Sequence, residues 1–154
     1  MKSVAQLLKA KGGGIYAIPP DASVFDGVKM LADKGVGAIL VMQGNRLVGI
    51  FSERDYARKV VLQGRSSKET QVREIMTRNV LWVSPRQTNE ECMALMTAKH
   101  IRHLPVMDEG QVIGMLSIGD LVKDLIGEQQ FLIQQLENYI HGSTDTSLAK
   151  SPLA

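Results

Sequence analysis

The chain has 154 residues, a net charge of +2, and 44% apolar against 22% charged residues. This length suits one domain with a buried core, and so small a charge disfavours nucleic acid or a membrane surface as a partner. No secretory signal opens the chain, no apolar run approaches the roughly 20 residues of a membrane span, and the single Cys92 cannot form an intramolecular disulfide. We therefore expect a cytoplasmic protein in a reducing compartment, with Cys92 as a small core residue.

The first half of the chain is predicted to run strand, helix, strand, strand, helix, after a short amphipathic helix near its start. Residues 15–18 are an apolar run stopped by two prolines, as at the end of a strand. Ser23 with Asp26 is a helix-capping pattern, and Gly35 is suited to end that helix. Two further apolar runs, at 39–42 and 47–51, are predicted to be strands joined by a turn. Ser52 then opens a second helix, at 52–62.

The second half repeats the first half 65 positions later, because residues 80–126 align with residues 15–61 without a gap. Thr88 and Glu91 take the places of the first capping pair. Two copies of a 47-residue unit are too few for a solenoid. They predict an α/β fold of the α+β kind, in which two β-α-β-β-α repeats pack as a pseudo-twofold pair with matched sites between them.

The expected domain boundaries follow from this repeat and from composition. From the N-terminus, the expected parts are repeat 1 with its lead-in helix at 3–62, a polar linker at 63–70, repeat 2 with its lead-in helix at 71–127, an amphipathic C-terminal helix at 128–141 and a disordered tail at 142–154. The lead-in segments match with an offset of 68, and the Gly12–Gly14 run accounts for the three extra residues. The apolar face of residues 131–140 either joins a dimer interface or packs back on its own repeats.

Patterns for catalysis and for metal binding are absent from the sequence. No HExxH, GxSxG or GxxxxGK[ST] motif occurs, and His100 and His103 have no third ligand nearby. A small enzyme would need a nucleophile and a base in a recognisable pair, and none is found. We expect neither an enzyme nor a metal site.

Each repeat carries a serine and an aspartate three residues apart, where a strand ends and a helix begins: Ser52 with Asp55, and Ser117 with Asp120. Ser-x-x-Asp is itself a capping pattern, which alone would explain both pairs. The alternative is a nucleotide site, because a helix N-terminus offers free N–H groups to phosphate. A carboxylate at such a turn can also accept both ribose hydroxyls. Both interpretations remain open at this level.

The segments before the middle strands, 36–38 and 101–103, occupy equivalent positions in the two repeats. Gly37 would allow the backbone to approach a flat base closely. Arg102 and His103 would offer charge to phosphate, as would Arg54. Ordinary solvated side chains would explain these residues equally well.

Each copy of this unit ends with the motif G-h-h-S-x-x-D, and the second is preceded by the V-x-x-I-M-T segment at 72–77. The two copies resemble CBS domains, whose tandem pair is called a Bateman module. The resemblance covers about residues 3–126. It implies a compact disc with two clefts between the copies, which bind adenosine compounds such as AMP, ADP, ATP, NAD or S-adenosylmethionine. It implies no catalytic cofactor, and pairing of two chains as a homodimer through their helices.

The resemblance also implies which residues contact the ligand. Asp55 and Asp120 would hold ribose hydroxyls, each with the serine three residues before it. Thr77, Val80 and Leu81 would complete the Asp55 cleft. The full set of expected contacts, with Tyr16, Val36 and Gly37 completing the Asp120 cleft, is Tyr16, Val36, Gly37, Ala38, Ser52, Arg54, Asp55, Thr77, Val80, Leu81, Ile101, Arg102, His103, Ser117, Gly119 and Asp120.

The leading hypothesis is therefore an adenine-nucleotide sensor that acts in trans, or as a homodimer, on an unidentified regulated protein. Gly119 stands where the first repeat has Arg54, so the two clefts should bind phosphate differently and with unequal affinity. The alternative is a protein-interaction scaffold, in which the two aspartates only cap helices.

Overall fold

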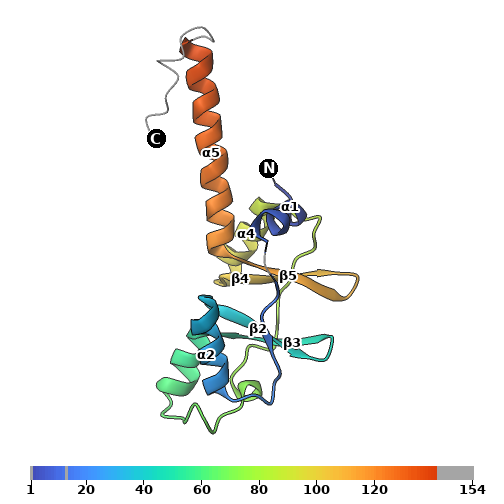
Figure 1. Cartoon of the computed structure of the whole chain (residues 1–154), viewed down its shortest axis with the longest axis vertical. Helices are drawn as coiled ribbons and strands as arrows, with labels where there is room; N and C mark the ends of the chain where they lie inside the picture. The colour runs from blue at the N-terminus through green and yellow to red at the C-terminus, as the bar shows by residue number, and fades with distance from the viewer. Residues whose placement is uncertain (1, 13, 142–154) are drawn as a thin grey trace.

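The computed structural model describes residues 2–12 and 14–141, so the tail expected at 142–154 lies outside the described residues. Two small sheets lie one above the other, with α2 beside the lower sheet and α1 and α4 beside the upper one (Figure 1). In chain order, the elements are α1 (Val4–Lys11), β1 (Ala17–Ile18), α2 (Val24–Lys34), β2 (Ala38–Gln43), β3 (Arg46–Ser52), α3 (Glu53–Tyr56), the π-helical η1 (Ala57–Val61), the 3-10 helix η2 (Val72–Glu74), α4 (Asn89–Lys99), β4 (His103–Asp108), β5 (Gln111–Ser117) and α5 (Ile118–His141). This order confirms the predicted α+β class.

The two sheets differ in their first strand. In the first half, β1 runs parallel to β2, which forms an antiparallel hairpin with β3. In the second half, β4 and β5 form the matching hairpin, but only a single bridge from Val83 to Val106 stands in for the first strand. The sequence explains the loss, because Leu40 donates its backbone N–H to the Tyr16 carbonyl at 3.0 Å, whereas Pro105 at the equivalent position has no N–H to donate. The strand that the repeat predicts near residue 80 is therefore not formed as a strand.

The lead-in segments are exchanged between the two halves. Val4 and Leu7 of α1 are buried among residues of α4, β4 and β5, whereas Val72 of η2 is buried among residues of α2, β2 and β3. The backbone contacts match: the Val4 N–H donates to the Gln87 carbonyl at 2.7 Å, and the Val72 N–H donates to the Ala22 carbonyl at 2.8 Å. Sequence reasoning grouped each lead-in with the repeat that follows it, but each one packs on the other repeat.

The C-terminal helix is longer than predicted. α5 is one helix of 24 residues, and it continues through Gly127, where the sequence suggested a boundary. A glycine inside a helix costs only about 1 kcal/mol relative to alanine, and Gly127 does not adopt the left-handed conformation that ends α2 at Gly35. The end of α5 extends away from both sheets (Figure 1).

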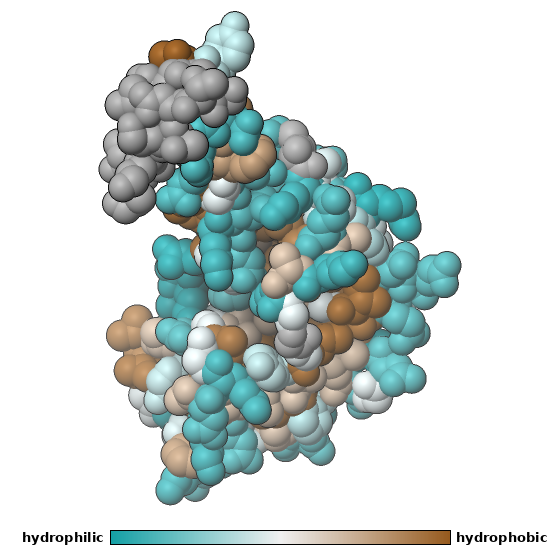
Figure 2. Space-filling model, turned by 45° about the horizontal axis from the view of Figure 1, so that its top comes forward, coloured by the Kyte–Doolittle hydropathy of each residue, from teal (hydrophilic) through white to brown (hydrophobic). Residues whose placement is uncertain are grey.

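The apolar side chains at this end of α5 stay exposed. The exposed fractions are 67% for Phe131, 59% for Leu132 and 54% for Leu136. The face at 131–140 therefore does not pack back on the sheets. Elsewhere, the face seen in Figure 2 is mostly hydrophilic, and its hydrophobic surface falls into separate patches.

Candidate functional site

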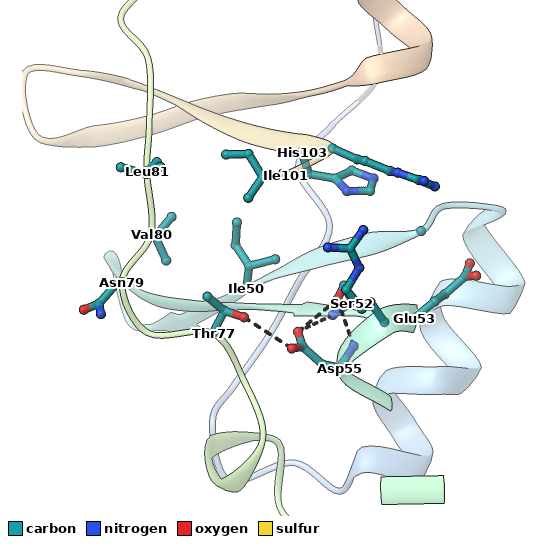
Figure 3. Close-up of a pocket in the computed structure, with 13 residues that line it drawn as sticks. Ile50, Ser52, Glu53, Asp55, Thr77, Asn79, Val80, Leu81, Ile101 and His103 are labelled. Carbon is teal, nitrogen blue, oxygen red and sulfur yellow. Dashed lines mark hydrogen bonds between the residues drawn. The ribbon is translucent and has the colours of Figure 1, made fainter. Parts of the chain in front are cut away.

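A cleft of about 260 Å³ opens between the two halves, and we call it the Asp55 cleft (Figure 3). Its walls come from the ends of β2 and β3, the start of α3, the segment after η2, and the segment before β4. The lining residues are Gly37, Ile50, Ser52, Glu53, Arg54, Asp55, Thr77, Asn79, Val80, Leu81, Ile101, Arg102 and His103. The structure thus brings ten of the sixteen expected ligand contacts into one cavity.

Asp55 lines this cleft, and four donors hold its carboxylate. The Ser52 N–H and hydroxyl lie 3.1 Å and 3.0 Å from its Oδ2. The Thr77 hydroxyl and the Lys59 ammonium lie 3.3 Å and 3.0 Å from its Oδ1. Ser52 also accepts the Asp55 N–H at 3.1 Å, which completes a capping box at the start of α3. Asp55 is therefore a helix cap and a wall of the cleft at once, so the two interpretations of Ser-x-x-Asp do not exclude each other.

One side of the cleft is apolar. Ile50, Val80, Leu81 and Ile101 form it, and Figure 3 shows Ile50 and Ile101 pointing toward each other across the cavity. An antiparallel bridge between Ile50 and Thr77 fixes this wall, with backbone hydrogen bonds of 3.0 Å and 2.9 Å. A flat aromatic base would suit this surface.

Cationic side chains lie on the other side. Arg54 at the start of α3 donates to the His100 carbonyl at 3.1 Å, which ties the first half to the second. Arg102 is exposed beside it. Burial lowers the pKa of His103, and the nearby positive charges of Lys11 and Arg102 lower it further, against the opposing effect of Asp120. Two guanidinium groups can bind an anion here.

Three lining residues were not among the expected contacts: Ile50, Glu53 and Asn79. Ile50 could have been found, because side chains two apart on a strand share a face, and Ser52 was already assigned to the site. Glu53 occupies the position between Ser52 and Arg54. Asn79 carried no signal, since it lies outside every motif.

The expected contacts from residues 16 and 36–38 lie differently from their assignment. Gly37 was assigned to the Asp120 cleft, but it lines the Asp55 cleft, where an added Cβ would lie 3.4 Å from the His103 ring. Tyr16 and Val36 pack against the core of the first half, and Ala38 is fully buried. Within the described chain, the lining of the Asp55 cleft does not include these three residues.

The second serine–aspartate pair has different partners. The Ser117 N–H donates to Asp120 Oδ2 at 2.8 Å, and the Asp120 N–H donates to the Ser117 hydroxyl at 3.2 Å, as in the first pair. The Lys11 ammonium, from the end of α1, lies 2.8 Å from the same Oδ2. Burial alone would raise the pKa of Asp120, but the hydrogen bonds from Lys11 and Ser117 outweigh it and lower the pKa. Gly119 is exposed at the start of α5.

Residues 2–12 and 14–141 contain neither a metal-binding cluster nor a membrane-spanning helix. No group of three or more His, Cys, Asp or Glu side chains could hold a metal ion in this part of the chain. Among the same residues, no helix has both the length and the apolar character needed to cross a membrane.

The fold and the cleft define a class: a module of two pseudo-symmetric α+β repeats with a small-molecule cleft between them. The chain belongs to the CBS domain family, since the family model for the CBS domain matches residues 14–62 and 72–127. CBS pair proteins are regulatory modules.

Relatives support this assignment over most of the chain. The mitochondrial CBS domain-containing protein CBSX3 of Arabidopsis thaliana is 39% identical over 149 residues, covering 91% of this chain and 72% of the relative. A solved CBS-domain protein from Burkholderia ambifaria is 55% identical, with a TM-score of 0.81 over 84% of this chain and 97% of that one. The protein PAE2072 from Pyrobaculum aerophilum, solved in complex with AMP, is 23% identical, with a TM-score of 0.70 over 81% of this chain and 98% of that one. Some relatives are much longer: this chain spans 21% of CBSCBSPB1 of Arabidopsis thaliana.

Proposed function

We propose that this chain is a regulatory module that binds an adenine nucleotide in the Asp55 cleft and acts on a separate protein. The observation that carries the proposal is the position of Asp55, a carboxylate only 6% exposed that lines a cleft between an apolar wall and a pair of arginines. An adenine nucleotide has the same three parts in the same order: a flat base, a ribose diol and a phosphate. The proposal includes no catalytic step.

We place the ribose at Asp55 because a ribose hydroxyl can replace one of the donors that bind this carboxylate. The Thr77 hydroxyl makes the longest of the four bonds to this carboxylate, at 3.3 Å, and Thr77 is exposed. A ribose hydroxyl can take the place of this neutral donor without leaving a charge unpaired. Lys59 reaches Asp55 from η1, also donates to the Ile75 carbonyl at 2.9 Å, and can stay in place.

The two walls of the cleft then suggest the positions of the base and the phosphate. The base would lie against Ile50, Val80 and Ile101, and the phosphate would lie near Arg54 and Arg102. A cleft of about 260 Å³ is slightly smaller than the ~300–1,000 Å³ found for small-molecule sites. We therefore place AMP ahead of ATP and NAD, and S-adenosylmethionine after them because it lacks a phosphate. PAE2072, which shares this fold, was solved in complex with AMP.

The apolar face of α5 supports pairing of two chains. In a homodimer, Leu132 and Leu136 of two copies would cover each other, since each is more than half exposed in the single chain. A change in helix pairing would then be the means by which a ligand is sensed by a partner protein. The cytoplasm remains the expected location, although the relative CBSX3 is named as mitochondrial.

The test is a thermal-shift experiment with AMP, ATP, NAD and S-adenosylmethionine on wild type, Asp55→Asn and Asp33→Asn. Asp33 is an exposed aspartate on α2 outside the cleft lining, so its variant is the matched control. A ligand at 100 times its Kd should stabilise the fold by about 2.7 kcal/mol, which for a domain of this size raises the Tm by roughly 5–10 °C. Only the increase caused by ligand is compared, because Asp55→Asn also weakens a helix cap.

The expected result is a shift for AMP in wild type and Asp33→Asn and a much smaller shift in Asp55→Asn. A folded wild type that responds to none of the four ligands would refute the proposal. In that case Asp55 is only a cap, and the exposed face of α5 makes a protein-interaction scaffold the function to test next.

A further inference from the structure

Thr77 makes two hydrogen bonds that shape the Asp55 cleft. Its backbone N–H donates to the Ile50 carbonyl at 2.9 Å, and its hydroxyl donates to Asp55 Oδ1 at 3.3 Å. The first bond pairs the chain at Thr77 with β3. The second gives the Asp55 carboxylate a neutral hydroxyl as a donor. Both bonds come from the lead-in segment of the second repeat.

At the Asp120 site, one side chain makes both of the corresponding bonds. Met115 and Asp120 stand 65 positions after Ile50 and Asp55. The Lys11 ammonium donates to the Met115 carbonyl at 2.7 Å and to Asp120 Oδ2 at 2.8 Å. A charged ammonium group therefore replaces the backbone N–H and the neutral hydroxyl of the first site.

This replacement follows from the longer helix in the first lead-in segment. The second lead-in is a single 3-10 turn, and the chain then extends alongside β3. α1 instead stays helical to Lys11 and ends at Gly12, whose φ is 65°. With the offset of 68 that relates Val4 to Val72, Lys11 corresponds to Asn79, which lines the Asp55 cleft. A ligand that approached Asp120 in the way proposed for Asp55 would therefore meet Lys11, which contacts this aspartate.

We infer that Lys11 is an internal competitor for the ribose at the Asp120 site, so that the chain has one strong and one weak nucleotide site. This inference rests on the proposed function, because it takes Asp55 and Asp120 as ribose-binding carboxylates. At Asp55, an incoming hydroxyl replaces another neutral hydroxyl. At Asp120, it must displace an ammonium that is 39% exposed and bound to a carboxylate that is 26% exposed. Because this ion pair is partly exposed, displacing Lys11 should weaken ligand binding without preventing it.

The Lys59–Asp55 ion pair does not make the two sites equal. Lys59 belongs to η1, four residues after Asp55, and is not part of the cleft lining. A ligand can therefore occupy the Asp55 cleft with this ion pair intact. Lys11 comes from a different element and occupies the approach to its aspartate.

The test is calorimetric titration of the full chain with AMP, using wild type, Lys11→Met and Lys9→Met. Methionine keeps an apolar stem without the charge. Lys9 is the matched control, because it is an exposed lysine on the same helix. Each variant is also made in the Asp55→Asn background, where only the Asp120 site remains, and Lys11→Gln serves if Lys11→Met does not fold.

Wild type should bind one AMP tightly and a second at least about fivefold more weakly. Lys11→Met should strengthen the second event by about fivefold, the value of one partly exposed ion pair, with the same gain in the Asp55→Asn background and none in Lys9→Met. An unchanged or weaker second event in Lys11→Met would overturn the inference, and a weaker one would mean that Lys11 binds the phosphate.

The proposed function and this inference can fail separately. One AMP bound by both wild type and Lys11→Met would refute the role of Lys11 and keep the Asp55 site. No AMP bound by wild type and one by Lys11→Met would refute the Asp55 site and keep the role of Lys11. No binding by either protein would refute both.

Discussion

A disulfide between Ser3→Cys and Thr88→Cys should form within one chain. The two residues pair in an antiparallel bridge, although about 85 residues separate them. Cα atoms in such a pair lie about 4.5–5.5 Å apart, inside the range of about 4.4–6.8 Å that a disulfide spans. The prediction follows from the packing of α1 on the second repeat.

The expected stabilisation can be worked out from the structure. Closing a loop of about 85 residues contributes roughly 4.5 kcal/mol in the chain-entropy model. Ser3 and Thr88 are the N-caps of α1 and α4, where they accept the Gln6 and Glu91 N–H groups. Losing each cap costs about 1 kcal/mol, so the net gain is about 2–3 kcal/mol. With a urea dependence of about 2 kcal/mol per molar, the oxidised form should unfold at a midpoint about 1 M higher than wild type. It should unfold about 2 M higher than its own reduced form, which lacks the same two caps.

The assay is urea unfolding of the oxidised and reduced protein, with non-reducing electrophoresis to show that the bond is intramolecular. The matched control is Ser3→Cys with Ser23→Cys. Ser23 caps α2 as Thr88 caps α4, but it pairs with Gln71, so this second pair should stay reduced. Closure of the control pair, together with failure of the first pair, would show that α1 packs on its own repeat and would refute the exchange of lead-in segments.

Three further predictions concern single residues. Gly49→Ala should destabilise the fold by about 1–3 kcal/mol, because its Cβ would lie 2.6 Å from Met76 Sδ and 3.0 Å from the Thr77 carbonyl oxygen; an unchanged urea midpoint would contradict this contact. Cys92 is fully buried, and burial raises its pKa to about 11. Iodoacetamide should therefore label it only as fast as the native state opens. Labelling at the rate of a free thiol would show that it is not buried. Burial lowers the pKa of His103 below its ordinary value of 6.5, so the unfolded chain binds a proton at this histidine at a higher pH than the folded chain does. Wild type should therefore lose stability relative to His103→Gln as pH falls through 6.5. Parallel stability curves from pH 7.5 to 5.5 would contradict the shift.

Local signals were predicted well from the sequence. Ser23, Ser52 and Thr88 are N-caps in the structure, as their spacing to the next acid indicated. A cap depends only on a few neighbouring residues, so its pattern is complete within the sequence. The repeat supplies each signal twice, so the sequence alone predicts the α+β class and the resemblance to the family.

Long-range relations were harder to predict. The offset of 68 showed that α1 and η2 correspond, but it does not say which repeat each one packs on. The loss of the first strand in the second half depends on Pro105, whose missing N–H matters only once its partner strand is known. The site shows the same limit: Asp55 and Thr77 were matched through the family resemblance, whereas Lys11 carried no motif and becomes important only because α1 ends beside Asp120.

The exchange of lead-in segments also sets an order of events during synthesis. The first repeat can complete its core once Met76 has emerged, because its cluster draws on no later residue. Val4 and Leu7 pack with residues that extend from Val83 to Leu121, so α1 leaves the ribosome long before its partners exist. At about 5–20 residues per second, the delay is roughly 5–20 s. During that interval the N-terminal segment has no partner and is too short to be a stable helix by itself. The part of the protein that is made first is therefore among the last to become native.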